Sequence, residues 1–196
     1  MKNKTINIII VVSTCALMFA LVVLGYVCFV RVFSERPIRT TQAFCSQQTK
    51  NNIVLYLYTE LIDMDKQTMS KSDMITSVEK QLALKHYRYT EKDFKNIKGG
   101  ECDLYKRIIT INSRLDQHAY AKSFVHEALH LKLLLVNEPF VCYNTFKFLY
   151  ENENAFLRET GLLYAINVLC GQYEGEYDIT NQIIYYFLIE KGETYV

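Results

Sequence analysis

The chain has 196 residues, a formal net charge of +1 and charged side chains at 22% of its positions. A nearly neutral chain of this kind lacks the broad basic surface of a nucleic-acid-binding protein, so we expect no nucleic-acid partner. Hydrophobic residues make up 50% of the chain, which is enough to build a sizeable core.

An uncharged apolar run over residues 8–30 is the first feature along the chain. Its length matches the roughly 20 residues that a helix needs to cross a bilayer. It exceeds the apolar core of a cleaved signal peptide, which has about 7–15 residues. The run therefore predicts an uncleaved anchor that makes the lipid bilayer a partner and the chain a single-pass membrane protein.

The side of the membrane is left open by the charges around this run. Two lysines precede it and three arginines follow it, and Lys and Arg near the helix ends set the orientation. The count is nearly even, with the extracytoplasmic side slightly favoured for the rest of the chain. We expect three parts: a stub and transmembrane anchor (1–33), a linker (34–49) and one domain (50–196).

Two helices are expected at the start of this domain. Residues 51–65 carry an apolar stripe at helical spacing that includes Ile53, Leu57 and Leu61. Ser70 and Asp73 then have the spacing of a capping box, which predicts a helix with Met74, Val78 and Leu82 on one face.

The next stretch is expected to change from helix to strand. Thr90 and Asp93 repeat the capping signal and predict a short helix that ends near the glycine pair at positions 99 and 100. Residues 101–111 follow as the best strand candidate in the chain.

The sequence His126-Glu127-Ala128-Leu129-His130 is an HExxH motif within an apolar helical run. Residues four apart lie on one face of a helix, so both imidazoles can bind one metal ion. Glu127 lies one step round the helix, where its carboxylate can take a proton from water. The motif therefore predicts two metal ligands and a general base. His118 is interpreted as a surface or capping histidine.

This segment, over residues 105–170, resembles the zincin metallopeptidases and among them the gluzincins, in which a glutamate of a later helix completes the zinc site. The resemblance implies Zn²⁺ as cofactor, His126 and His130 as ligands, Glu127 as catalytic base and a peptide or protein as substrate. It also implies that the strand near residues 108–112 lines the cleft and pairs with an extended substrate. The expected fold class is α+β and predominantly helical: a transmembrane helix, then a small zincin-like domain with a short sheet next to the HExxH helix.

The third zinc ligand is expected on a long helix over residues 143–170. Glu153 is favoured, because apolar residues occupy the neighbouring positions on its helical face and a carboxylate there is costly unless it is paired or bound to metal. Glu151 and then Glu159 are the alternatives. A final helix is expected from Asp178 or Thr180 to Ile189.

The function expected from these features is a membrane-anchored zinc metallopeptidase. The alternative is a catalytically inactive, membrane-anchored zincin-like protein with a binding or regulatory role. Four cysteines follow the apolar run, and the sequence leaves open whether they pair: Cys45, Cys102, Cys142 and Cys170.

Overall fold

The computed structural model describes residues 47–64, 67–95, 98–170 and 178–192. The helices of this part are α2 (Gln47–Asp63), α3 (Lys71–Leu82), α4 (Gln117–Leu133), α5 (Glu138–Tyr150), α6 (Ala155–Leu169) and α7 (Asp178–Gly192). The strands are β1 (Arg88–Lys92), β2 (Gly100–Asp103) and β3 (Ile108–Asn112). The described part is therefore mostly helical, with one small sheet.

None of the helices in these ranges is long and apolar enough to cross a bilayer. The longest of them, α2 and α4, have 17 residues each, fewer than the roughly 20 that a bilayer core requires. This finding corrects the predicted fold with its N-terminal transmembrane helix and the single-pass membrane location drawn from it. The run over residues 8–30, on which that prediction was made, lies outside the described residues.

The sheet has the order β1-β3-β2, with β3 parallel to β1 and antiparallel to β2. The predicted helix that begins near Thr90 is wrong, because residues 88–92 form β1. Thr90 lies opposite Thr110 of β3, with 3.1 Å between the two hydroxyl oxygens. The capping pattern does not produce a helix here, because the backbone of β3 provides hydrogen-bond partners along the whole of β1.

The predicted strand over residues 101–111 is interrupted by a turn. Asp103 ends β2 and accepts a hydrogen bond from the backbone N–H of Lys106, 2.8 Å away. Arg107 then takes a φ of 54° before β3 begins. The stretch is therefore a hairpin, and its second strand buries Ile109 and Ile111 against the helices.

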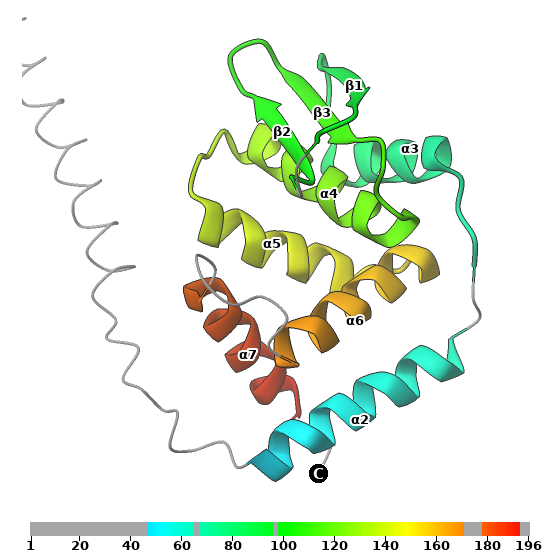
Figure 1. Cartoon of the computed structure of the whole chain (residues 1–196), viewed down its shortest axis with the longest axis vertical. Coiled ribbons are helices and arrows are strands. Elements are labelled where there is room, and N and C mark those ends of the chain that lie inside the picture. Colours follow the sequence, from blue (N-terminus) through cyan, green and yellow to red (C-terminus); the bar gives the residue numbers. More distant parts are fainter. Residues whose placement is uncertain (1–46, 65–66, 96–97, 171–177, 193–196) are drawn as a thin grey trace, which may run out of the picture. The chain divides into compact units, whose positions relative to one another are not determined.

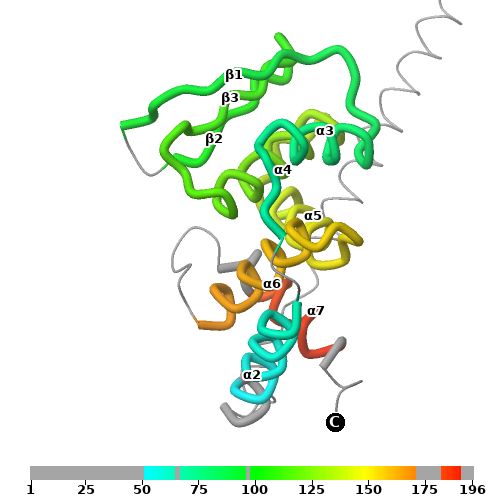
Figure 2. Tube along the Cα trace, turned by 90° about the vertical axis from the view of Figure 1, so that its right-hand side faces the viewer, coloured from blue at the N-terminus to red at the C-terminus, as the bar shows by residue number. Residues whose placement is uncertain are grey.

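Helix α4, which carries the HExxH motif, lies between the sheet on one side and helices α5 and α6 on the other. Figures 1 and 2 show the sheet and α3 at one end of the described part, then α4, α5 and α6, with α7 and α2 at the other end. Tyr120, Phe124 and Leu131 of α4 are almost completely buried. A helix with apolar residues on nearly all sides is expected in such an interior position. Asp116 caps it by accepting a hydrogen bond from Ala119 N–H at 2.8 Å.

The first two predicted helices are present. Helix α2 buries Ile53 and Leu57 and contacts α6. Ser70 caps α3 through a hydrogen bond from the backbone N–H of Asp73, as the capping box predicts, and α3 buries Met74 and Val78.

The predicted helix over residues 143–170 is in fact two helices. Helix α5 ends at Tyr150, and Asn154 caps α6 by accepting a hydrogen bond from Leu157 N–H at 3.1 Å. Asparagine side chains bond to nearby backbone groups and so favour helix ends over helix interiors. The two helices then pack very closely, because a Cβ on Gly161 of α6 would lie only 2.4 Å from the backbone nitrogen of Tyr150.

Candidate metal centre

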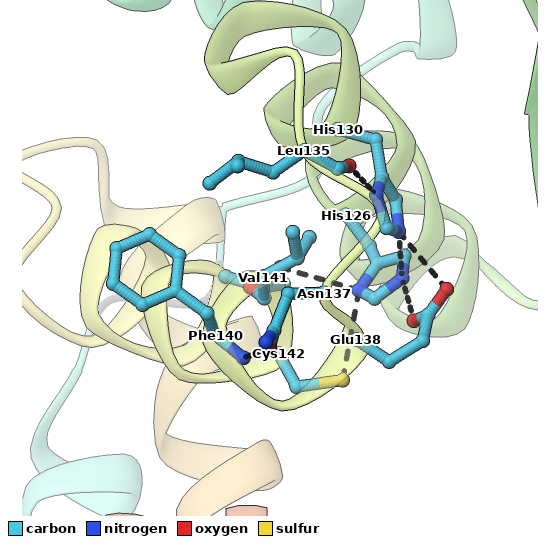
Figure 3. A network of polar contacts seen from close by, with 9 residues as sticks. His126, His130, Leu135, Asn137, Glu138, Phe140, Val141 and Cys142 are labelled. Carbon is cyan, nitrogen blue, oxygen red and sulfur yellow. Dashed lines mark hydrogen bonds and ion pairs between the residues drawn. The ribbon is translucent and has the colours of Figure 1, made fainter. Parts of the chain in front are cut away.

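Helix α4 brings the two histidines of the motif together, and a carboxylate from α5 joins them (Figure 3). The Nε2 atoms of His126 and His130 lie 3.0 Å apart. Glu138 places one carboxylate oxygen 3.1 Å from His126 Nε2 and the other 3.2 Å from His130 Nε2. Within the described part of the chain, these three residues form the group that can hold a metal ion.

Glu138 reaches the histidines because α5 begins at this residue. Asn137 caps the helix by accepting a hydrogen bond from Phe140 N–H at 3.0 Å, and Pro139 lies in the first turn. A proline is well accommodated there, since its missing N–H has no helical partner to lose. A negative charge is also favoured at the positive end of a helix, so the first turn holds this carboxylate beside the rings of α4.

The other ring nitrogen of each histidine faces a polar atom of the protein. His130 Nδ1–H donates to the carbonyl of Leu135 at 2.6 Å. His126 Nδ1 lies 3.4 Å from Thr145 Oγ1, a hydroxyl that donates its own proton to the carbonyl of Val141. A proton on Nδ1 of each ring would leave both Nε2 atoms to bind a metal ion at the common site. Metal-binding histidines are oriented in the same way by their outer partners.

The spacing of the three ligand atoms fits a small divalent cation. Ligand bonds of about 2.0–2.2 Å in a tetrahedron separate neighbouring ligand atoms by roughly 3.3–3.5 Å. The two nitrogens are 3.0 Å apart here, and they lie 3.1 and 3.2 Å from different oxygens of Glu138, so a small movement of the rings and of the carboxylate brings both nitrogens and one oxygen to that geometry. Two imidazoles and one carboxylate suit zinc, and they also suit several other transition metals.

Glu127, the predicted base, lies against strand β2. It is buried, and a Cβ on Gly100 would come within 3.0 Å of its Cγ atom. Burial raises the pKa of Glu127 to about 8, and the negative charge of Glu138 adds to the rise. A carboxyl group with a pKa near neutrality is suited to accept and return a proton at neutral pH.

The glutamates predicted as third ligand are not brought to the histidines. Glu153 is exposed in the turn between α5 and α6, where it lines a separate pocket of about 770 Å³ together with Glu151. The prediction assumed one continuous helix there, whereas the chain turns and buries Asn152 instead. Glu159, the remaining candidate, lies beside a different histidine: its Oε1 atom is 3.8 Å from His118 Nε2.

Glu138 is the site residue that the sequence analysis missed. The signal for it was present, because Asn137 before Glu138 and Pro139 is a helix start. A helix that starts at this point has the Glu138 carboxylate in its first turn, eight residues after His130.

His118 is half-buried, with 33% of its side chain exposed, and the residue that caps α4 is Asp116. The Nδ1 atom of His118 lies 2.9 Å from Thr160 Oγ1, and its ring stacks on Phe156 with 4.9 Å between the ring centroids. It therefore has a packing role between α4 and α6, away from the candidate metal centre.

The cysteines of the described part are all free thiols, namely Cys102, Cys142 and Cys170. Cys142 lies beside the site, with its sulfur 3.8 Å from His126 Nδ1. Cys45 lies outside the described residues.

The strand expected to pair with substrate has no open edge. Strand β3 is the middle strand of the sheet, so β1 and β2 occupy its two sides. The edge strand beside Glu127 is β2, which corrects the expectation for residues 108–112.

Comparisons with protein-family models, with curated proteins and with solved structures give no match. The likeness to the zincins therefore rests on the HExxH residues themselves, and membership of that group stays a prediction.

Proposed function

We propose that the chain is a zinc-dependent peptidase with His126, His130 and Glu138 as metal ligands and Glu127 as general base. The observation that carries the proposal is the convergence of both Nε2 atoms and the Glu138 carboxylate, with each Nδ1 atom facing a polar group of the protein. If the two histidines occurred on this helix by chance, nothing would be expected to orient both Nε2 atoms toward one carboxylate.

The protein residues divide the reaction between them. Zinc held by His126, His130 and Glu138 would supply a Lewis acid and would lower the pKa of a bound water molecule toward 7. Glu127 accepts the proton of the attacking water and returns it to the leaving amine. The exposed position of Glu138 leaves one side of the centre accessible, and an extended substrate can add to the outer edge of β2.

Metal binding is tested on the purified full chain. Zinc content and zinc affinity are compared among the wild type, Glu138→Gln and Glu153→Gln. We expect Glu138→Gln to weaken zinc binding by more than about 100-fold, since it removes a direct ligand and outer partners alone contribute 10- to 100-fold. Glu153→Gln removes the same charge from the neighbouring turn and should bind zinc like the wild type. Equal affinities for all three proteins would contradict the ligand assignment.

Catalysis is tested separately with Glu127→Gln. This variant should keep its zinc and lose about 10²- to 10⁴-fold in cleavage of a peptide library, the usual contribution of a general base. If zinc binds but the wild type and Glu127→Gln cleave equally poorly, the peptidase assignment is wrong while the metal centre stands.

A further inference from the structure

A second, unrelated pocket of about 410 Å³ lies where α3 and α4 end, beside the turn between β2 and β3. Its polar lining consists of Lys85, His86, Arg107 and Lys132, and the remaining lining is aliphatic. No acidic side chain lines it. Such a composition is unusual in a chain whose acidic and basic residues are almost equal in number, with 21 Asp and Glu against 22 Lys and Arg.

The positive charges of this pocket are not neutralised by carboxylates of the described residues. Some exposed cations elsewhere on the surface have carboxylate partners, as in the pairs Lys71–Glu91 at 3.3 Å and Arg114–Asp93 at 2.7 Å, whereas Lys80 and Lys147 form no such pair within the described residues. Lys85, Arg107 and Lys132 form no ion pair with a carboxylate in the part of the chain that the structure describes. Three cations thus line one hollow without a counter-charge there.

The guanidinium of Arg107 is held in a fixed orientation. Its Nε donates to the carbonyl of His86 and its Nη2 to the carbonyl of Lys85, both at 2.8 Å. For the remaining N–H groups of this guanidinium, no acceptor occurs among the described residues. An immobilised arginine with free donors is suited to bind two oxygens of a phosphate or carboxylate.

A simpler explanation is that the basic residues stabilise the ends of the two helices. The C-terminus of a helix acts as roughly −0.5 charge, so α3 and α4 together offset about one of the three positive charges. Moreover, backbone N–H groups already donate hydrogen bonds to carbonyl oxygens at these helix ends. Leu84 N–H donates to the carbonyl of Glu79, and Leu135 N–H donates to the carbonyl of His130. About two positive charges therefore remain without a counter-charge.

We propose that this pocket binds a phosphate-bearing small molecule through Lys85, Arg107 and Lys132. A phosphate monoester carries close to two negative charges at neutral pH, which matches the charge that the helix ends leave over. The aliphatic lining provides a surface for the uncharged part of the same molecule. This site is separate from the candidate metal centre and does not depend on the proposed peptidase activity.

The test uses the full chain and measures binding of pyrophosphate and of adenosine triphosphate by calorimetry at low salt, with and without a metal chelator. The chelator separates this pocket from any phosphate bound through a cation at the histidines. The double variant Lys85→Ala/Lys132→Ala is compared with Lys80→Ala/Lys147→Ala, which removes the same charge from the 770 Å³ pocket. All four lysines are exposed, so both variants should fold, and thermal unfolding checks this.

We expect both probes to bind with the chelator present and to lose at least tenfold in affinity in Lys85→Ala/Lys132→Ala but not in Lys80→Ala/Lys147→Ala. Equal losses in the two double variants would mean a general charge effect and would overturn the proposal. The absence of binding to the wild type would overturn it as well. Citrate serves as a carboxylate of similar charge, and binding of citrate as tight as that of pyrophosphate would refute recognition of phosphate.

Discussion

At the scale of single residues, Gly100 sets the position of the proposed base. A Cβ at this position would lie 2.9 Å from the carbonyl oxygen of Thr110 and 3.0 Å from the Cγ of Glu127. The glycine therefore allows α4 to approach β2 closely enough to bury the Glu127 carboxyl group. The candidate centre therefore depends on the lack of a side chain at Gly100 as well as on the Glu127 carboxylate.

Gly100→Ala should accordingly destabilise the domain by about 1–3 kcal/mol, the usual cost of excess volume in a packed site. The free energy of unfolding in urea measures this cost. Gly99→Ala is the comparison, because there the nearest atom is the Ser123 hydroxyl oxygen at 2.4 Å, which can rotate away. A smaller loss for Gly100→Ala than for Gly99→Ala would contradict this account.

The thiol of Cys102 in β2 should react slowly and with a steep dependence on pH. Burial raises the pKa of Cys102 to about 12, with further rises from the charges of Glu127 and Asp103 and a smaller opposing effect of Arg107. Since the thiolate is the reactive form, only roughly one thiol in 10⁴ is reactive at pH 8. The rate should therefore rise about tenfold per pH unit from 8 to 10.

Alkylation of the full chain by iodoacetamide, followed by peptide mass spectrometry, measures this rate. The exposed Cys170 provides a reference within the same molecule. Labelling of Cys102 as fast as Cys170 at pH 8 would show that Cys102 is more accessible than the half-buried thiol of the structure.

At the scale of elements, the start of α3 depends on one hydroxyl group. Ser70 accepts a hydrogen bond from the Asp73 N–H at 3.1 Å, which satisfies a backbone donor that the helix itself leaves free. Ser70→Ala should lower the free energy of unfolding by about 1 kcal/mol. Ser72→Ala, at an exposed position inside α3, should change it by less than about 0.5 kcal/mol. Denaturant titration of both variants distinguishes the cap from a general effect of losing a serine.

At the scale of the whole molecule, the candidate metal centre joins α4 to the first turn of α5. A cation that binds only the folded chain adds about 2.7 kcal/mol of stability at a concentration 100 times its Kd. For a domain of this size that corresponds to roughly 5–10 °C in Tm. Chelation of zinc should lower the Tm of the wild type by this amount and leave the Tm of Glu138→Gln unchanged. An identical Tm of the wild type with and without zinc would argue against a metal that links these helices.

Much of the helical structure and three residues of the candidate site, His126, Glu127 and His130, were predictable because their causes are local. The apolar stripe of α2, the Ser70 cap and the one-turn spacing of His126 and His130 all act over three or four residues. Such interactions form within a single element, so they can be predicted directly from the sequence.

The carboxylate that lies beside the two histidines was not predicted, because its place depends on where helices end and how they pack. Glu153 has apolar neighbours only if residues 143–170 form one helix, and the turn after Tyr150 removes that condition. Thr90 likewise carries a valid capping pattern, yet it lies in β1 because β3, 20 residues further on, supplies its hydrogen-bond partners.

The amino-acid sequence alone determined the paired histidines, the adjacent acid and the helix that carries them. Only the tertiary structure decided which glutamate faces them, which strands form the edges of the sheet and which lysines line a second pocket. The reason is physical: a helical turn is specified by residues a few positions apart, whereas the meeting of α4 with α5, or of β1 with β3, depends on packing and pairing energies that no short stretch of sequence contains.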